Sequence, residues 1–588
     1  MHTHFKRLLT CTALAIALQT ATAQPLPPDI TARIDSLFSQ WNKTSSPGCA
    51  IGVVRNDSLI VAKGYGMANL EYNVPITPET IFHMASVAKQ FTAYSILLLQ
   101  KQGKLSLDDD IHKYLTWFPD LKERITIRNL LNHTSGIRDQ WEMLVTAGTR
   151  LDDVVTQDQI LKILAKQQAL NFKPGTDWSY SNSNYTLLAE IVKTVSGQSL
   201  RQFTDSAIFK PLGMTHTHFR DDYTEILPNR SYGYTPIEQA QDHYANAMLN
   251  YSTVGPAGLF SNVDDMSKWI MNFYAPKIGN EKDIEELTEP VLVNGTKRRY
   301  YAKGIVADSL YGQKRYQHGG VDIGYQTFVS IFPDLKLGFI VFSNLGNTDA
   351  QRKNEQLAKL FIKDNTPKRK DYSSRRDSAL AIITDTQSVK KYAGAYIAND
   401  GTRFSFAVRD RKLYGITPNG KYHLLIETGD EVYELFTDTT LYFKFSSTRP
   451  GPGSSAASGS GGSSGSSGGA GSGPDRIVTD EYWPTGNHLH LEKYDTAAKT
   501  DRQLSAYTGT YYCPELDCNY RIGLNNHRLF LSNAKYSDSP LVLYGDDHLL
   551  DDFWFMNHIH ITRNTKNQIT GFELNGDRVM HLKFVKTN

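Results

Sequence analysis

The stretch "SVAKQFTAYSILLLQKQG", residues 86–103, has the pattern of one long helix that begins with a serine. Its apolar residues recur at helical spacing, and Gly103 follows the last turn, as a glycine often does where a helix ends. A serine in the first turn lies beside free backbone N–H groups, and a lysine one turn later lies on the same face. The stretch therefore predicts a helix with Ser86 at its start and Lys89 next to it.

This pairing is compatible with nucleophilic catalysis. The free N–H groups can stabilise an oxyanion, and the helix dipole together with burial disfavours a charged lysine. A neutral Lys89 can accept the Ser86 proton. The same Ser-x-x-Lys spacing occurs at residues 388–391 and 532–535, but both lie in β-rich sequence. A structural alternative stays open here, in which Ser86 only caps the helix and Lys89 is solvated.

The stretch "KPGTDWSYSNSNY", residues 173–185, carries a second pair of polar side chains. Tyr180 and Asn182 stand in a predicted loop before the amphipathic "TLLAEIVKTVSG", so that a phenol and an amide can both point into a cleft. A buried tyrosine with a bonded hydroxyl is the commoner fate of such a residue.

A third stretch, "YQHGGV" at residues 316–321, places a histidine and two glycines just before a predicted strand. Gly319 and Gly320 would let the backbone of a substrate lie along the strand edge, with His318 beside it. Considered alone, His318 fits a loop histidine next to turn glycines better than a site residue.

The order of these three motifs resembles the penicillin-recognising serine hydrolases, in the branch of class C β-lactamases and D-aminopeptidases. The likeness spans about residues 30–350 and includes the flanking stretches "LLNHTSGI", "GPAGLFSNVDDM" and "FPDLKLGFIVFSNL". It implies an α+β fold of the β-lactamase/transpeptidase class, an antiparallel sheet flanked by helices, over residues 24–365.

The resemblance also implies roles for the motif residues. Ser86 would be the acylated nucleophile and Lys89 its proton acceptor. Tyr180 would be the acid/base shared between acylation and deacylation, and Asn182 would bind the substrate amide. The N–H groups of Ser86 and Val321 would form the oxyanion hole.

The third motif departs from the family pattern of Lys-Thr/Ser-Gly. His318, Gly319 and Gly320 are then the substrate-binding positions, with histidine in place of lysine and glycine in place of a hydroxyl residue. Histidine is largely neutral near pH 7, so it is a weaker and pH-dependent anchor for a carboxylate. Both changes favour peptidase or esterase relatives over efficient β-lactam hydrolysis.

The C-terminal part of the chain contains an internal repeat. Tyr392-Ala-Gly-Ala-Tyr396 corresponds to Tyr507-Thr-Gly-Thr-Tyr511, and short alternating strands follow each copy. This predicts two all-β, barrel-like domains, which the resemblance makes lipocalin-like. The predicted boundaries are a linker at 366–385, a first β domain at 386–497 with a disordered Gly/Ser-rich hairpin insertion at 450–475, and a second β domain at 498–588.

Composition excludes several classes of function. The chain has 588 residues, 40% apolar and 21% charged, as in a soluble protein of several domains. The formal net charge of +2 gives no reason to expect a nucleic-acid partner. No run beyond the N-terminus approaches the ~20 apolar residues of a membrane span. Phosphate-binding glycine loops and His-Glu-x-x-His motifs are missing, so we expect neither a cofactor nor a metal.

The N-terminus has the features of a cleaved secretory signal. Basic residues at 6–7 precede an apolar run at 8–18 and small residues at 21–23. We expect residues 1–23 to be removed and the protein to be exported to the periplasm or outside the cell. In an oxidising compartment, Cys513 and Cys518 could close a small local loop.

Together these features predict a secreted serine hydrolase that forms an acyl-enzyme on Ser86 and acts on short peptides, with D-residues among them, or on small amides and esters. One alternative is a true class C-type β-lactamase. Another is an inactive protein that binds a ligand with its β domains. The sequence does not indicate the oligomeric state.

Overall fold

The computed structural model describes residues 26–365, except 238–241, 294–296 and 299, and residues 389–587, except 399–402, 417–421, 430–431, 436–437, 449–475, 483–487, 495–498, 545–546 and 552. The predicted signal at 1–23, the linker at 366–385 and the Gly/Ser-rich insertion lie outside the described residues.

The N-terminal domain is built on an antiparallel six-stranded sheet of order β14-β15-β16-β17-β1-β2. Apolar runs at both ends of the domain sequence form its centre, because strands covered on both faces need few polar residues. All seven residues of β17 are buried, and it pairs with β1 from Cys49↔Ser343 to Arg55↔Leu337. The strands are β1 (Cys49–Arg55), β2 (Ser58–Tyr65), β14 (Val306–Leu310), β15 (Gln313–Asp322), β16 (Tyr325–Phe332) and β17 (Leu337–Ser343).

Helices cover both faces of this sheet. Alternate β1 residues enter two separate hydrophobic cores, one with α1 (Pro28–Phe38) and α11 (Ala350–Lys359), the other with α9 (Val263–Met271). Two further helices, α2 (Lys89–Lys101) and α6 (Asn182–Ser196), pack together in the second core. This arrangement confirms the predicted α+β class.

The predicted helix at 86–103 is shorter than expected. A 3₁₀ turn, η2 (Ala85–Ala88), precedes α2, so Ser86 lies in a tighter turn before the helix proper. Ala85 adopts a left-handed backbone conformation with φ of 47°. Sequence periodicity cannot indicate such a turn, because it involves only four residues.

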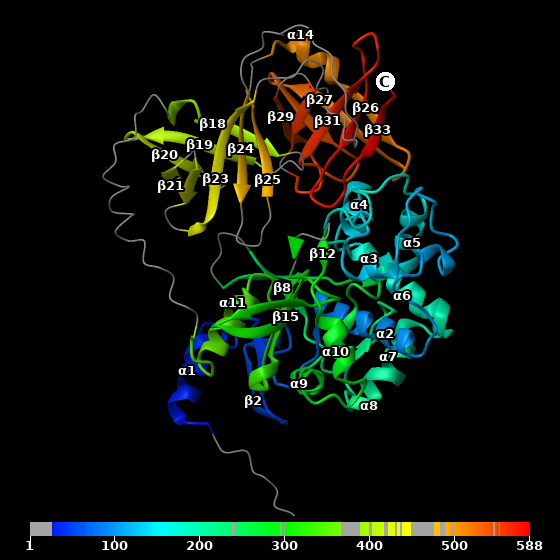
Figure 1. The fold of residues 1–588 in the computed structure, drawn as a ribbon, viewed down its shortest axis with the longest axis vertical. Coiled ribbons are helices and arrows are strands. Elements are labelled where there is room, and N and C mark those ends of the chain that lie inside the picture. The colour runs from blue at the N-terminus through cyan, green and yellow to red at the C-terminus, as the bar shows by residue number, and fades with distance from the viewer. Residues whose placement is uncertain are drawn as a thin grey trace, which may run out of the picture.

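In the described residues, the C-terminal β region forms two antiparallel units of eight strands each. Figure 1 shows the two units side by side. In the first β unit, β18 pairs with both β19 and β25; its strands are β18 (Gly394–Ala398), β19 (Arg403–Arg409), β20 (Lys412–Ile416), β21 (Tyr422–Gly429), β22 (Val432–Leu435), β23 (Asp438–Thr448), β24 (Arg476–Tyr482) and β25 (His488–Tyr494). The C-terminal barrel is closed by β26 and β33; its strands are β26 (Gly509–Cys513), β27 (Cys518–Asn525), β28 (Arg528–Ser532), β29 (Ser539–Tyr544), β30 (His548–Leu550), β31 (His558–Arg563), β32 (Ile569–Leu574) and β33 (Leu582–Lys586).

The repeated Tyr-x-Gly-x-Tyr segments have the same local structure. The Tyr396 hydroxyl donates to the carbonyl of Tyr392 (3.0 Å), and the Tyr511 hydroxyl donates to the carbonyl of Tyr507 (2.6 Å). Each segment therefore ties the start of its unit to its first strand.

The C-terminal barrel lies against the helical side of the N-terminal domain, next to α4 (Gln140–Thr146) (Figure 1). Leu144 and Val145 of α4 share one hydrophobic core with Cys518 and Tyr520 of the barrel. The Tyr520 hydroxyl also donates to the carbonyl of Thr146 at 2.9 Å. Among the described helices, none is long and apolar enough to cross a membrane.

Candidate active site

The Ser86 turn is held against the sheet. The hydroxyl of Thr327, on β16, donates to the Met84 carbonyl at 2.9 Å. Strand β15 also passes so closely that a Cβ on Gly320 would stand 2.3 Å from the Met84 oxygen. Glycine is required at this position, because any side chain would separate the strand that carries His318–Val321 from the turn that carries Ser86.

Lys89 is fully buried beside Ser86. Its Nζ lies 2.8 Å from the carbonyl of Pro256, 2.8 Å from Oδ1 of Asn182 and 3.1 Å from Oγ of Ser86. The two carbonyl oxygens can only accept hydrogen bonds. A neutral amine has two hydrogens and one lone pair, so its hydrogens go to Pro256 and Asn182 and its lone pair faces the Ser86 hydroxyl. This is the geometry of a general base with its nucleophile.

The surroundings favour the neutral amine. Burial holds the pKa of Lys89 well below its usual value; the Asp139 charge opposes this shift, and the Arg578 charge adds to it. A cation in a low-dielectric environment is disfavoured unless it is paired. No carboxylate lies within ion-pair distance of Lys89 among the salt bridges of the described residues.

Tyr180 covers the other side of the lysine. Its ring centroid lies 4.8 Å from Lys89 Nζ. Burial raises the pKa of the Tyr180 phenol, and a hydrogen bond with Ser86 only partly opposes that shift. Near neutral pH the phenol is therefore protonated and can donate a proton, while Lys89 is the better resting base.

Asn182, the first residue of α6, orients the lysine. Its Oδ1 accepts from Lys89, while its backbone N and its Nδ2 both donate to Oδ2 of Asp139, at 2.7 and 2.8 Å. Asp139 caps α4 and accepts from the backbone N–H of Trp141 at 2.9 Å. Asn182, which the resemblance predicts to bind the substrate amide, thus already forms hydrogen bonds with Lys89 and with Asp139.

His318 lies on β15 and is only 6% exposed. The Ser181 N–H donates to Nδ1 of His133, so the His133 proton is on Nε2 and points to the Tyr301 hydroxyl, 3.2 Å away. Tyr301 can then donate to Nε2 of His318 (3.2 Å), whose Nδ1–H donates to the Gly319 carbonyl at 2.7 Å. Burial and the nearby Lys89 lower the pKa of His318 to about 4. His318 is therefore a neutral, fully bonded ring at neutral pH.

The structure thus brings the predicted residues of all three motifs together. Gly319 and Val321 continue β15 past the Ser86 turn, with the Val321 side chain 73% exposed. Sequence reasoning missed Asp139, Tyr301 and Arg578, which also line the site. The guanidinium of Arg578 lies 5.3 Å from the centroid of the Tyr180 ring. Its signal could not be found locally, because Arg578 belongs to the C-terminal barrel.

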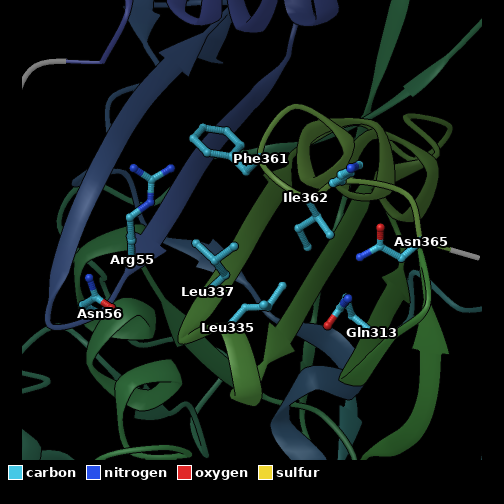
Figure 2. Close-up of a pocket in the computed structure, with 9 residues that line it drawn as sticks. Arg55, Asn56, Gln313, Leu335, Leu337, Phe361, Ile362 and Asn365 are labelled. Carbon is cyan, nitrogen blue, oxygen red and sulfur yellow. The ribbon is translucent and has the colours of Figure 1, made fainter.

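A pocket of about 320 Å³ has a lining that does not include Ser86 (Figure 2). Arg55, Gln313 and Phe361 are among its lining residues, with the Arg55 guanidinium 5.5 Å from the Phe361 ring centroid. Gln313 begins β15, whereas His318 and Val321 lie toward the other end of that strand. The pocket contains none of the groups described above and carries no evident chemistry.

Within the described ranges, no three His, Cys, Asp or Glu side chains are grouped as metal ligands. Cys513 of β26 lies opposite Cys518 of β27 in the barrel. Both are buried, free cysteines.

Comparisons with known proteins agree with this geometry. The sequence model of the family described as Beta-lactamase matches residues 34–361. A D-aminopeptidase of Gluconobacter oxydans (strain 621H) is 28% identical over 299 residues, which cover 51% of this chain and 56% of that protein. The putative penicillin-binding protein PbpX of Bacillus subtilis (strain 168) is 30% identical over 296 residues, covering 50% of this chain and 70% of that protein.

One solved structure shows the shared fold. The octameric penicillin-binding protein homologue from Pyrococcus abyssi has a TM-score of 0.51 at 21% identity, and the match covers 79% of this chain and 99% of that one. The present chain spans little more than half the length of the D-aminopeptidase. Because the family model matches more than half of the 588 residues, the chain belongs to the Beta-lactamase family.

Proposed function

We propose that this hydrolase cleaves short peptides, with D-residues among them, or small amides and esters, through an acyl-enzyme on Ser86. The observation that carries the proposal is the position of Lys89, fully buried, with its Nζ 3.1 Å from the Ser86 hydroxyl. The relatives named above include a D-aminopeptidase, which supports an amide substrate.

In the proposed reaction, Ser86 Oγ attacks the substrate carbonyl while its proton passes to Lys89. The backbone N–H groups of Ser86 and Val321 stabilise the oxyanion. The bond to the leaving group breaks as Tyr180 donates a proton to it, and Lys89 restores the Tyr180 proton. Water then attacks the ester, its proton returns through the same groups, and the acid product leaves Ser86 free.

Two features of the site differ from the β-lactamase pattern. His318 is neutral and bonded to Tyr301, so it offers no cation at the position of the family lysine. The cation next to Tyr180 is instead Arg578, which comes from the barrel and lies 5.3 Å from the Tyr180 ring centroid. We therefore expect poor turnover of a chromogenic cephalosporin, and turnover near the diffusional limit of about 10⁸ M⁻¹s⁻¹ would favour the β-lactamase function instead.

Intact-mass analysis with a fluorophosphonate tests the acyl-enzyme proposal. The native chain should gain one adduct, Ser86→Ala should gain none, and Ser532→Ala should react like the native chain. Ser532 is the matched control, because it begins a Ser-x-x-Lys sequence on β28, away from the site. An adduct that persists in Ser86→Ala, or its absence from the native chain, would contradict the proposal and favour the ligand-binding alternative.

We further propose that the protein is exported, on the basis of residues 1–23. N-terminal sequencing of the protein from its own cells should give a chain that begins at about residue 24, and an intact Met1 would exclude cleavage.

A further inference from the structure

The loop at 575–581, between β32 and β33 of the C-terminal barrel, reaches the Ser86 site. Its backbone is fixed to the N-terminal domain by hydrogen bonds on both sides of Arg578. The Arg578 N–H donates to Glu142 at 2.9 Å, and its carbonyl accepts from Asp139 N at 3.1 Å and from Asn171 Nδ2 at 2.9 Å. The Met580 N–H donates to Asn171 Oδ1 at 2.8 Å. The loop is therefore placed as firmly as an element of the catalytic domain.

A short chain of bonds connects this loop to the catalytic base. Asp139 donates its N–H to the Arg578 carbonyl and accepts from Asn182, which in turn accepts from Lys89. The position of Arg578 and the position of Lys89 thus depend on the same residue, Asp139, through its backbone N–H on one side and its carboxylate on the other.

The Arg578 side chain extends over Tyr180 and remains accessible. Its guanidinium lies 5.3 Å from the Tyr180 ring centroid, and its side chain is 40% exposed. In the described part of the chain its ion pair is formed through Nε, 3.4 Å from Oδ2 of Asp577. The two Nη groups lie outside that pair, and such a fork suits the two oxygens of a carboxylate.

Other charges near the guanidinium leave it positive. Asp139 and Asp577 are carboxylates, and the third acidic neighbour, Glu142, is buried with its pKa raised well above the usual value, first by burial and then by the charge of Asp139. Against burial, these neighbours raise the pKa of Arg578. Among the residues that the structure describes, Arg578 is therefore the accessible cation of the site, while His318 is neutral.

We propose that Arg578 is a substrate-binding residue of the Ser86 site, and that it binds a free carboxylate of the substrate from a position on the C-terminal barrel. The proposal rests on the proposed hydrolase function, because the carboxylate belongs to the substrate that Ser86 attacks. It makes the barrel part of the active site, which the β-lactamase-like domain alone does not complete.

Binding of two matched ligands to the full chain tests this role. In the Ser86→Ala background, calorimetry compares N-acetyl-D-alanine with N-acetyl-D-alaninamide, which lacks the carboxylate. Arg578→Met should weaken binding of the acid by about tenfold or more and leave the amide within about twofold. Arg578→Lys should restore part of the difference. Arg409→Met is the control, because Arg409 also stacks on a tyrosine ring, that of Tyr422 in the first β unit.

The outcomes separate the two proposals. If the acid binds no more tightly than the amide to protein with Arg578, or if Arg578→Met weakens both ligands equally, the anchor role is wrong. Ser86-dependent hydrolysis of p-nitrophenyl acetate by the native chain is measured in parallel. Its absence, with the calorimetric preference intact, would overturn the hydrolase proposal and leave Arg578 as a carboxylate-binding residue of a site without hydrolase activity.

Discussion

The two β units have similar strand orders and the same Tyr-x-Gly-x-Tyr start, yet they differ in what they contact. The described apolar core of the first unit, with Tyr396 and Phe445, is separate from that of the N-terminal domain. The core of the C-terminal barrel, with Tyr511 and Phe572, is continuous with it. A repeated fold has therefore acquired two different relations to one catalytic domain, and among the described residues of the two units it is the barrel that supplies a residue next to Tyr180.

The strongest test of this difference is the buried ion pair between Arg138 and Glu515. The two side chains are 0% and 5% exposed and 2.7 Å apart across the barrel interface. Glu515→Gln leaves the Arg138 charge buried without its partner, so we expect the interface to lose about 3 to 5 kcal/mol of stability. The first thermal unfolding transition should fall accordingly.

An exposed pair at the same interface is the matched control. Lys535 and Asp153 are 2.9 Å apart, with side chains 50% and 37% exposed. Lys535→Met should cost only about 0 to 1 kcal/mol. Equal shifts of the transition for Glu515→Gln and Lys535→Met would mean that the barrel is not held by its buried charges.

A smaller effect is expected from the loop itself. A Cβ on Gly576 would stand 2.1 Å from Oε1 of Glu142, so Gly576→Ala must displace either this buried carboxyl, which accepts from the Arg578 N–H, or the loop that carries Arg578. We expect kcat/KM to fall by about ten- to a hundredfold, because small displacements of positioning groups are costly. In the first unit, a Cβ on Gly415 would meet its nearest atom at 4.0 Å, so Gly415→Ala should be neutral. If Gly576→Ala kept the kcat/KM of the native chain, the position of this loop would not matter for catalysis.

These contacts also mark the limit of sequence reasoning. The apolar runs of β1 and β17, and the three motifs with Ser86, Tyr180 and His318, are local patterns, and local patterns could be recognised. The contact of Arg578 with Tyr180 joins segments about four hundred residues apart. Its loop, "NGDRVMH", has the composition of an ordinary hairpin turn, so no local rule distinguishes it.

The positive φ of Ala85 and the neutral state of His318 could not be predicted from the sequence either. The first depends on how closely β15 approaches the turn, and the second on burial against Tyr301. Both arise from tertiary packing, which overrides the ordinary preferences of an alanine and a histidine.

The Arg578 charge should also appear in the pH profile. It lowers the pKa of Lys89, so Arg578→Met raises that pKa and more alkali is needed to form the neutral amine. The acid limb of kcat/KM for p-nitrophenyl acetate should move to higher pH. Arg409→Met, in the first β unit, should leave the limb in place. A shift to lower pH, or none, would mean that Lys89 is not the base or that Arg578 does not reach it electrostatically.

The smallest effect is expected at His318, the other potential cation of the site. Its pKa of about 4 keeps the ring neutral above about pH 5, whereas an unperturbed histidine would titrate near ~6.5. His318→Gln removes a group that does not change charge in the assay range, and a glutamine amide can still bond to Tyr301. The shape of the profile between about pH 5 and pH 9 should therefore match that of the native chain. If the native profile of kcat/KM had a limb near pH ~6.5 that disappears in His318→Gln, His318 would titrate in the assay range. His318 on β15, and not Arg578, would then be the residue that binds the substrate carboxylate.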